Sequence, residues 1–190
     1  MADETGEVHW LAPDLRAVIE LDQLKVSRSL RTILRREKFE LKVDVAFEEV
    51  LVACADRPDG TWISKEIGVA YCALCDLGYA HSVEAWHEGR LAGGLYGVAI
   101  GGAFFGESMF HRETDASKAA LVHLVERMLG RGMTLLDVQF MNPHLRSMGA
   151  VEIPRREYER RLRRAVRLPV SFGDMCPTLG AKAALTAYEG

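Results

Sequence analysis

Two polar side chains, Asp137 and Gln139, are the sequence's first candidates for chemistry. They lie two positions apart in a stretch with the pattern of a buried strand, so both point to one face of a sheet. A carboxylate makes a site electronegative, whereas the glutamine amide is a poor base that acts by orienting a hydrogen bond. The alternative is that Asp137 only completes a local polar network.

A third candidate, Glu107, follows a glycine at the end of an apolar strand. A carboxylate in such a place is costly unless it has a partner or a cationic ligand. A positively charged ligand would supply that charge, and so would an internal salt bridge to Arg112. The residue types leave both interpretations open.

An exposed aromatic platform is suggested by Trp62, which follows Gly60 and Thr61 in a loop-like stretch. A flat indole stacks on nucleic-acid bases with little sequence preference, at roughly 1–3 kcal/mol per base. The alternative is an ordinary core tryptophan. The neighbouring glycine and threonine favour the loop, and therefore the stacking role.

Arginines crowd two stretches that have the pattern of helices. Only Glu157 and Glu159 interleave with the second set, so its arginines cannot all be paired locally. Phosphates of a nucleic acid would explain the excess, because they dominate affinity without being read as sequence; a solvated charged face is the alternative. The sets are Arg28, Arg31, Arg35, Arg36 and Lys38, and Arg155, Arg156, Arg160, Arg161, Arg163, Arg164 and Arg167.

Composition indicates an ordinary soluble protein with one core. The 190 residues are 48% hydrophobic and 27% charged, with a formal net charge of −3. The first ten residues are acidic and lack the apolar stretch of a signal peptide, and five glycines interrupt the apolar run 91–105. We therefore expect a cytoplasmic protein, with its four cysteines as thiols and the pair Cys72 and Cys75 packed in a helix rather than binding metal.

The elements that must position these residues alternate between helices and strands. The order predicts an α+β domain in which an antiparallel meander is followed by a long helix and another strand. Residues 1–24 are expected to be irregular, and no clear pattern follows Ser171. Ser27 and Ser64 are expected to cap helices. The predicted helices are 27–38, 47–55, 64–77, 116–129, 143–148 and 154–167, and the predicted strands are 39–45, 82–86, 91–100, 103–110 and 134–140.

Seven segments, spread in order over roughly residues 8–166, resemble one known family, the leucyl/phenylalanyl-tRNA–protein transferases. The segments are Gly60-Thr61-Trp62-Ile63, Gly78 to Trp86, Gly93-Gly94-Leu95-Tyr96-Gly97-Val98, Gly106-Glu107-Ser108-Met109-Phe110, Ala116-Ser117-Lys118, Leu136-Asp137-Val138-Gln139, and Leu145 to Arg156.

The resemblance implies a GNAT-type acyltransferase domain. It implies transfer of leucine or phenylalanine, less often methionine, from charged tRNA to the α-amine of proteins that begin with arginine or lysine. The product is an N-end-rule degradation signal, and no cofactor or metal is needed. The resemblance implies catalytic roles for Asp137, Gln139 and Glu107, substrate binding by Trp62, Leu95, Phe104, Leu124 and Ser108, and tRNA binding by Arg28, Arg31, Arg35, Arg155, Arg156, Arg160 and Arg163.

The chain also departs from the family pattern. The family usually carries a further N-terminal region of several dozen residues. The similarity of this chain begins at Val8 to Asp14, where the family pattern is Trp-Trp-Ser-Pro-Asp-Pro-Arg, and Trp10 matches one of the two tryptophans. We expect a remnant segment at 1–24, a GNAT-like domain at 25–168 and a tail at 169–190. A monomer is expected, with no membrane partner. From the residues alone, the interpretation of Leu95, Phe104 and Leu124 as core residues is favoured over a side-chain pocket.

Two other functions remain open. A non-catalytic protein could hold charged tRNA or an N-terminal degradation signal without transfer, and only turnover separates it from the transferase. A CoA-dependent N-acyltransferase on the same fold is disfavoured, because the long helix is entered through the acidic, glycine-free stretch His111 to Ser117.

Overall fold

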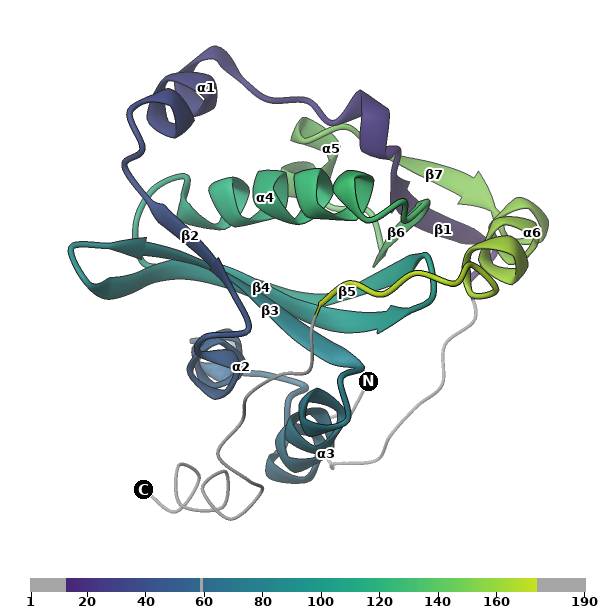
Figure 1. Cartoon of the computed structure of the whole chain (residues 1–190), viewed down its shortest axis with the longest axis horizontal. Helices are drawn as coiled ribbons and strands as arrows, with labels where there is room; N and C mark the ends of the chain where they lie inside the picture. The colour runs from purple at the N-terminus through teal and green to yellow at the C-terminus, as the bar shows by residue number, and fades with distance from the viewer. Residues whose placement is uncertain (1–12, 59, 174–190) are drawn as a thin grey trace.

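A single seven-stranded sheet organises the chain, in the order β2-β3-β4-β5-β6-β1-β7 (Figure 1). The computed structural model describes residues 13–58 and 60–173, so Trp10 and the predicted tail beyond 173 lie outside the described residues. The expected meander is confirmed: β3, β4 and β5 pair antiparallel in sequence order. The strands are β1 Leu15–Ile19, β2 Glu40–Val43, β3 Ala80–His87, β4 Arg90–Ile100, β5 Ala103–His111, β6 Leu135–Gln139 and β7 Ala150–Pro154.

Helices cover both faces of the meander, giving the predicted mixed α+β fold. In Figure 1, α4 lies on one face and α2 and α3 lie on the other. Ser27 and Ser64 cap α1 and α3 as expected, because each hydroxyl accepts a hydrogen bond from the backbone three residues on. The helices are α1 Arg28–Arg35, α2 Phe47–Ala55, α3 Lys65–Asp76, α4 Ala116–Gly130, α5 Pro143–Ser147 and α6 Arg155–Ala165, with a 3-10 turn at Leu21–Gln23.

The sequence prediction missed two strands, β1 and β7. The expectation that residues 1–24 are irregular was wrong for 15–19, because β1 lies inside the sheet between β6 and β7. Its apolar residues 17–19 are buried consecutively and show no alternation, and β7 is a five-residue strand that ends in Pro154. The segment predicted as a separate remnant, 1–24, therefore contributes a strand to the same sheet as the rest of the chain. Phe172, in the predicted tail, packs in the core, with its ring centroid 4.9 Å from that of Phe104.

Glu107 occupies a β-bulge between β4 and β5. Tyr96 pairs with Ser108, but its neighbour Gly97 pairs with Gly106, so Glu107 is the extra residue of β5. A bulge bends its strand and re-aims a side chain. Glycine is required at position 97 because a Cβ there would lie 2.2 Å from the backbone oxygen of Phe105.

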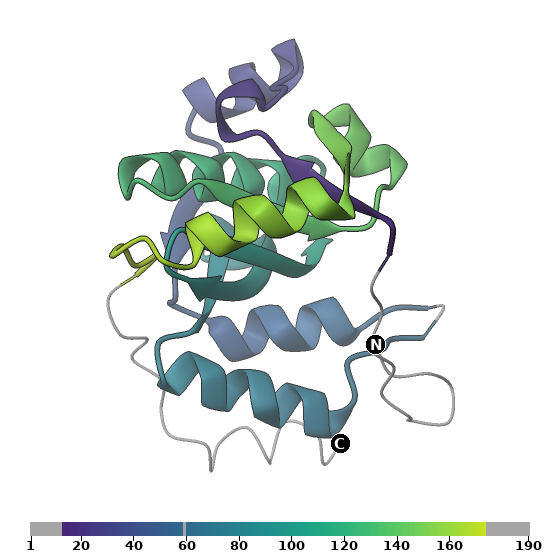
Figure 2. The same ribbon diagram turned by 90° about the vertical axis from the view of Figure 1, so that its right-hand side faces the viewer.

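The two central strands of the sheet separate beside this bulge. β5 and β6 run parallel, joined by α4, and pair only from Ala103 with Leu135 to Phe105 with Asp137. Both strands continue beyond that point without pairing to each other. The α6 helix packs against the part of the sheet formed by β1, β6 and β7 (Figure 2).

One further sequence interpretation can be compared with the structure. Cys72 and Cys75 are buried in the apolar cluster that joins α2 and α3 to the sheet, as the packing interpretation predicted. Nearby on β3, His81 Nδ1 lies 2.7 Å from Asp44 Oδ2, and the Ser82 hydroxyl donates to Glu84. Within residues 13–58 and 60–173, no helix is long and apolar enough to cross a membrane.

Candidate active site

A cavity of about 1020 Å³ lies where β5 and β6 separate. Elements from both sides of the sheet line it, including the loop after α2, the first half of α4 and α5. The lining residues include Arg57, Trp62, Leu95, Glu107, Ser108, Leu121, Leu124, Leu136, Val138 and His144. The structure thus brings together five of the residues predicted from the sequence: Trp62, Leu95, Leu124, Glu107 and Ser108.

Glu107 is the carboxylate at the wall of this cavity. Its Oε2 accepts a hydrogen bond of 2.8 Å from Nε2 of Gln139, and the Tyr71 hydroxyl also donates to it. Burial raises the pKa of the Glu107 carboxyl, and these two neutral donors offset part of the rise. The predicted alternative, a salt bridge to Arg112, is not formed, because Arg112 lies 3.7 Å from Glu49 instead.

Gln139 has an unusual backbone that aims its side chain at Glu107. Its φ is +65°, in the left-handed region that non-glycine residues rarely adopt. The backbone N–H donates to Asp137 Oδ1 at 2.8 Å, and Nε2 also donates to the Gly106 carbonyl at 3.2 Å. The left-handed turn is therefore held at both ends by hydrogen bonds.

Asp137 is fully buried and does not line the cavity. Its carboxylate accepts two-pronged hydrogen bonds from Arg16, with Nη2 2.9 Å from Oδ2, and a 2.6 Å bond from the Tyr158 hydroxyl. The expectation that Asp137 and Gln139 present their side chains to one place therefore needs revision. The charge of Asp137 is matched by Arg16, and its link to the cavity runs through the backbone of Gln139.

The apolar wall of the cavity differs from the prediction at one residue. Leu95 of β4 and Leu124 of α4 line it together with Leu136 and Val138 of β6. Phe104 does not, because its side chain is 0% exposed and packs in the core. Trp62, which also lines the cavity, is half-buried, with its ring 6.4 Å from that of Tyr71 between centroids.

Arg57 is a cavity residue that the sequence analysis did not single out. Its Nη2 donates to the Ser108 hydroxyl and to the Met109 carbonyl, each at 3.0 Å, and its Nε donates to the Cys54 carbonyl at 3.1 Å. Ser108, predicted to bind substrate, thus joins β5 to the loop that follows α2.

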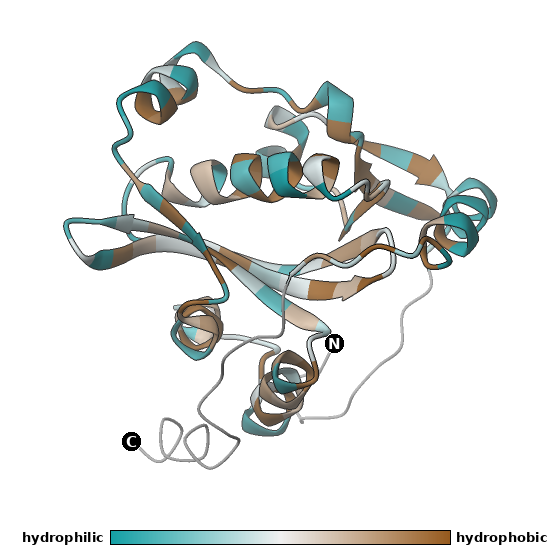
Figure 3. Cartoon of the chain, viewed as in Figure 1, coloured by the Kyte–Doolittle hydropathy of each residue, from teal (hydrophilic) through white to brown (hydrophobic). Residues whose placement is uncertain are grey.

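The predicted basic elements form two separate surfaces. The α6 helix is strongly hydrophilic along its length (Figure 3), and it lies far from α1 in Figure 1. Arg155 and Arg163 pair with Glu159, and Arg160 pairs with Glu157. Among the residues that the structure describes, the arginines of the two sets without an ion pair are Arg156, Arg164 and Arg167 in and after α6, and Arg28, Arg31, Arg35 and Arg36 in and after α1.

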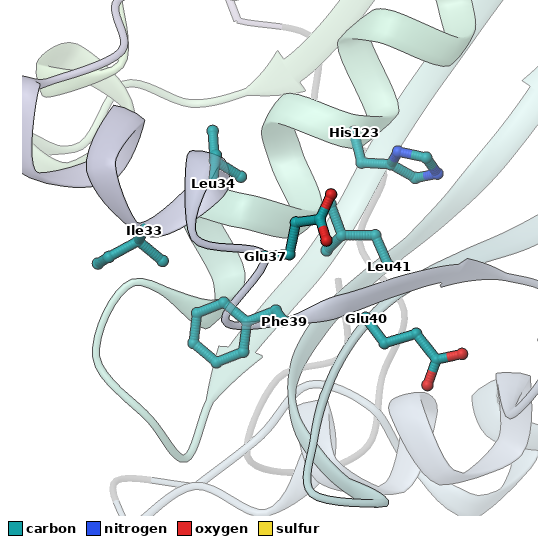
Figure 4. A pocket seen from close by; sticks show the side chains of 7 residues that line it. All are labelled: Ile33, Leu34, Glu37, Phe39, Glu40, Leu41 and His123. Carbon is teal, nitrogen blue, oxygen red and sulfur yellow. The ribbon is translucent and has the colours of Figure 1, made fainter.

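A second hollow, of about 470 Å³, lies between α1, β2 and α4 (Figure 4). Apolar side chains line it together with Glu37, Glu40 and His123, and none of the predicted site residues is among them. It is therefore separate from the cavity at Glu107.

Three side chains missed from the sequence hold the site together: Arg16, Tyr71 and Tyr158. Arg16 lies two residues beyond the stretch Val8 to Asp14, and its residue type alone did not indicate its partner Asp137. Tyr71 and Tyr158 lie on helices whose sequence gives no sign of which strand they face.

Comparison with known proteins gives a consistent result. A family model described as leucyl/phenylalanyl-tRNA protein transferase matches residues 18–163. A protein of that name from Gloeobacter violaceus is 56% identical over 173 residues, which are 90% of this chain and 89% of that protein. Another from Rubrobacter xylanophilus is 58% identical over 173 residues, 90% of both chains. Among solved structures, "L-PGS from Bacillus licheniformis" has a TM-score of 0.45 at 14% identity, covering 68% of this chain and 46% of that one.

Proposed function

The chain belongs to the leucyl/phenylalanyl-tRNA–protein transferase family, and we propose that it transfers leucine or phenylalanine from aminoacyl-tRNA to proteins that begin with arginine or lysine. The family is one of aminoacyltransferases, so this chain is an enzyme of that class. The observation that supports the proposal at the level of the site is the cavity itself. It combines an apolar wall with the buried carboxylate of Glu107, which forms no ion pair with another described residue.

The reaction requires little of the protein beyond positioning, because the ester of an aminoacyl-tRNA is already activated. The acceptor amine nitrogen bonds to the ester carbonyl carbon, and the bond from that carbon to the ribose oxygen breaks. The proton lost by the amine ends on the ribose hydroxyl that leaves. The protein must therefore hold an amine, a carbonyl and a ribose in one place.

Glu107 is the group suited to attract the amine. It is partly desolvated and bonded only by the neutral donors of Gln139 and Tyr71, so its charge remains available to an α-ammonium or to an arginine or lysine side chain. Attraction at this carboxylate favours a cationic first residue over an apolar one. This accounts for an acceptor that begins with arginine or lysine.

Asp137 and Gln139 act in this proposal as one positioning unit. Asp137 receives the backbone N–H of Gln139 and keeps that residue in its left-handed conformation. Gln139 then fixes Glu107 with its amide. Asp137 is too buried to touch either substrate, so its role is indirect.

The apolar wall of Leu95, Leu124, Leu136 and Val138 is suited to the donor side chain. An apolar pocket of this kind discriminates weakly among near-isosteres, which fits acceptance of leucine and phenylalanine, with methionine as a further donor. Trp62 also lines the cavity as a stacking surface for the terminal adenosine. Unpaired arginines of α1 and α6 would bind tRNA phosphates.

We also propose a GNAT-type domain for this chain, with β1 as part of it. Antiparallel strands β3 to β5, the α4 crossover and the parallel strand β6 form the strand–strand–helix–strand core of such acyltransferases. A CoA donor is the weaker alternative. Asp115, the N-cap residue of α4, pairs with Lys118, and a carboxylate at that helix end disfavours a pyrophosphate.

The proposal is tested by a transfer assay with a panel of acceptors. The chain is mixed with leucyl-, phenylalanyl- or methionyl-tRNA and with peptides that differ only in their first residue, and the products are identified by mass spectrometry. Transfer to arginine and lysine peptides is expected, and transfer to alanine or glutamate peptides is not. Binding of charged tRNA without transfer to any peptide would instead favour a non-catalytic binding protein. Turnover with an acyl-CoA but not with aminoacyl-tRNA would favour the CoA reading.

A further inference from the structure

Arg57 stands out among the residues that line the cavity at Glu107. It is the one arginine or lysine in that lining within the described residues, where the carboxyl side chains are those of Asp56 and Glu107. The planar guanidinium is the side chain best matched to the oxygens of a phosphate. Its presence in a cavity proposed for a nucleotide ester requires an explanation.

The guanidinium of Arg57 is held in place before any ligand arrives. Three protein oxygens accept its hydrogen bonds: the carbonyls of Cys54 and Met109 and the hydroxyl of Ser108. All of them are neutral, so the positive charge is fixed in position without being neutralised. A side chain ordered in advance loses less entropy on binding, which strengthens its hold on an anion.

The position of Arg57 relates it to the expected nucleotide. The loop that carries it also carries Trp62, the proposed platform for the terminal base, and its hydrogen-bond partner Ser108 directly follows Glu107, where the ester is to react. A nucleotide with its base at Trp62 and its acylated ribose at Glu107 would extend along the cavity that Arg57 also lines. Arg57 is the cation available there.

We propose that Arg57 binds the phosphodiester that joins the last two nucleotides of the aminoacyl-tRNA. This inference rests on the proposed transferase function and deepens it. The contact reads no sequence and fixes the register of the acceptor end, so that the ester carbonyl stops beside Glu107. Arg57 thus binds the donor tRNA at its acceptor end, apart from the arginines of α1 and α6.

The test uses a charged tRNA in which only this linkage is altered. Chemically aminoacylated tRNA is prepared with either the natural terminal phosphodiester or an uncharged methylphosphonate there, and transfer to an arginine peptide is measured with both. For the wild-type chain we expect kcat/KM to fall about 10- to 100-fold with the methylphosphonate, the range for a lost hydrogen bond to a charged group. The Arg57→Gln variant should show the same loss with natural tRNA and little further loss with the altered one.

Matched controls separate this contact from a general loss of structure or of charge. A methylphosphonate one linkage further from the terminus, combined with Arg57→Gln, should give losses that multiply. Arg156→Gln, on the exposed face of α6, combined with the terminal methylphosphonate should also multiply. Arg57→Lys keeps a charge but not the three-way hydrogen bonding, and should retain part of the discrimination between the two linkages.

Two results would overturn the inference. One is a wild-type chain that uses both terminal linkages equally well, since no charge would then be recognised there. The other is a full multiplicative loss when Arg57→Gln meets the terminal methylphosphonate, which would make Arg57 a structural clamp between α2 and β5. Failure of the transferase function itself would show separately, as absent transfer from natural tRNA by the wild-type chain.

Discussion

At the scale of single residues, the account depends on a carboxylate that is kept partly out of water with only neutral donors around it. Such a group is costly to the fold and useful to a site that binds cations. The desolvation cost to stability and the benefit to cation binding can be measured separately at Glu107, because glutamine has nearly the same shape and no charge.

Glu107→Gln should lower transfer and raise stability at neutral pH. Removing the charge takes away the attraction for the acceptor amine, so we expect kcat/KM for an arginine peptide to fall by about 10- to 100-fold, as for a lost hydrogen bond to a charged group. Removing the desolvation cost of the buried charge should raise the free energy of unfolding at pH 7. Peptide kinetics and urea unfolding of both proteins measure these changes.

The pH dependence of that stability difference has a definite sign. Burial raises the pKa of Glu107, so between its ordinary and raised values the folded chain holds a proton that the unfolded chain has lost. The free energy of unfolding of the wild type therefore falls as pH rises through that window. The advantage of Glu107→Gln should be largest above the window and absent near pH 4. The raised pKa of Glu84 affects both proteins equally and cancels. An advantage that grows as pH falls would contradict the assignment.

At the scale of elements, the bulge in β5 and the two faces of α6 carry the site. Two glycines, at 97 and 106, pair across β4 and β5 beside the bulge. The glycines differ in how much room surrounds them, and this difference makes a matched pair of variants.

Gly97→Ala should damage the fold, and Gly106→Ala should not. A Cβ at position 97 meets the Phe105 carbonyl oxygen at 2.2 Å, whereas at position 106 the nearest atom is the Asp137 oxygen at 3.4 Å. We expect Gly97→Ala to lower the free energy of unfolding by about 3 kcal/mol, the upper range for overpacking, and Gly106→Ala by less than about 1 kcal/mol. Equal effects in urea unfolding would show that the bulge is not constrained as described.

The inner and outer faces of α6 should affect different kinetic constants. Tyr158→Phe removes the 2.6 Å hydrogen bond to Asp137 and so loosens Gln139, and it should lower kcat about fivefold with little change in KM for tRNA. Arg156→Gln changes an exposed, unpaired arginine on the same helix, and should raise KM for tRNA and weaken its salt dependence while leaving kcat unchanged. Steady-state kinetics at two salt concentrations distinguish them. A fall in kcat for both variants would mean that α6 acts as one unit.

At the scale of the whole molecule, the sequence predicted the meander, the helix caps and the long helix because each has a local pattern. It also predicted five of the residues that line the cavity. It did not predict β1 and β7, because the apolar residues of β1 in the sheet interior show no alternation and β7 is only a five-residue strand at the edge of the sheet. It could not reveal that Asp137 is bonded to Arg16, 121 positions away, because that contact depends on β1 pairing with β6.

The most direct test of the central claim is transfer by the whole chain, residues 1–190, from leucyl-tRNA to one arginine-starting peptide and to the same peptide with an acetylated α-amine. The account predicts a gain of one leucyl residue on the first peptide, at its N-terminus by fragmentation, and no gain on the second. A chain that binds leucyl-tRNA but leaves the free-amine peptide unchanged, or that modifies both peptides alike, would contradict it.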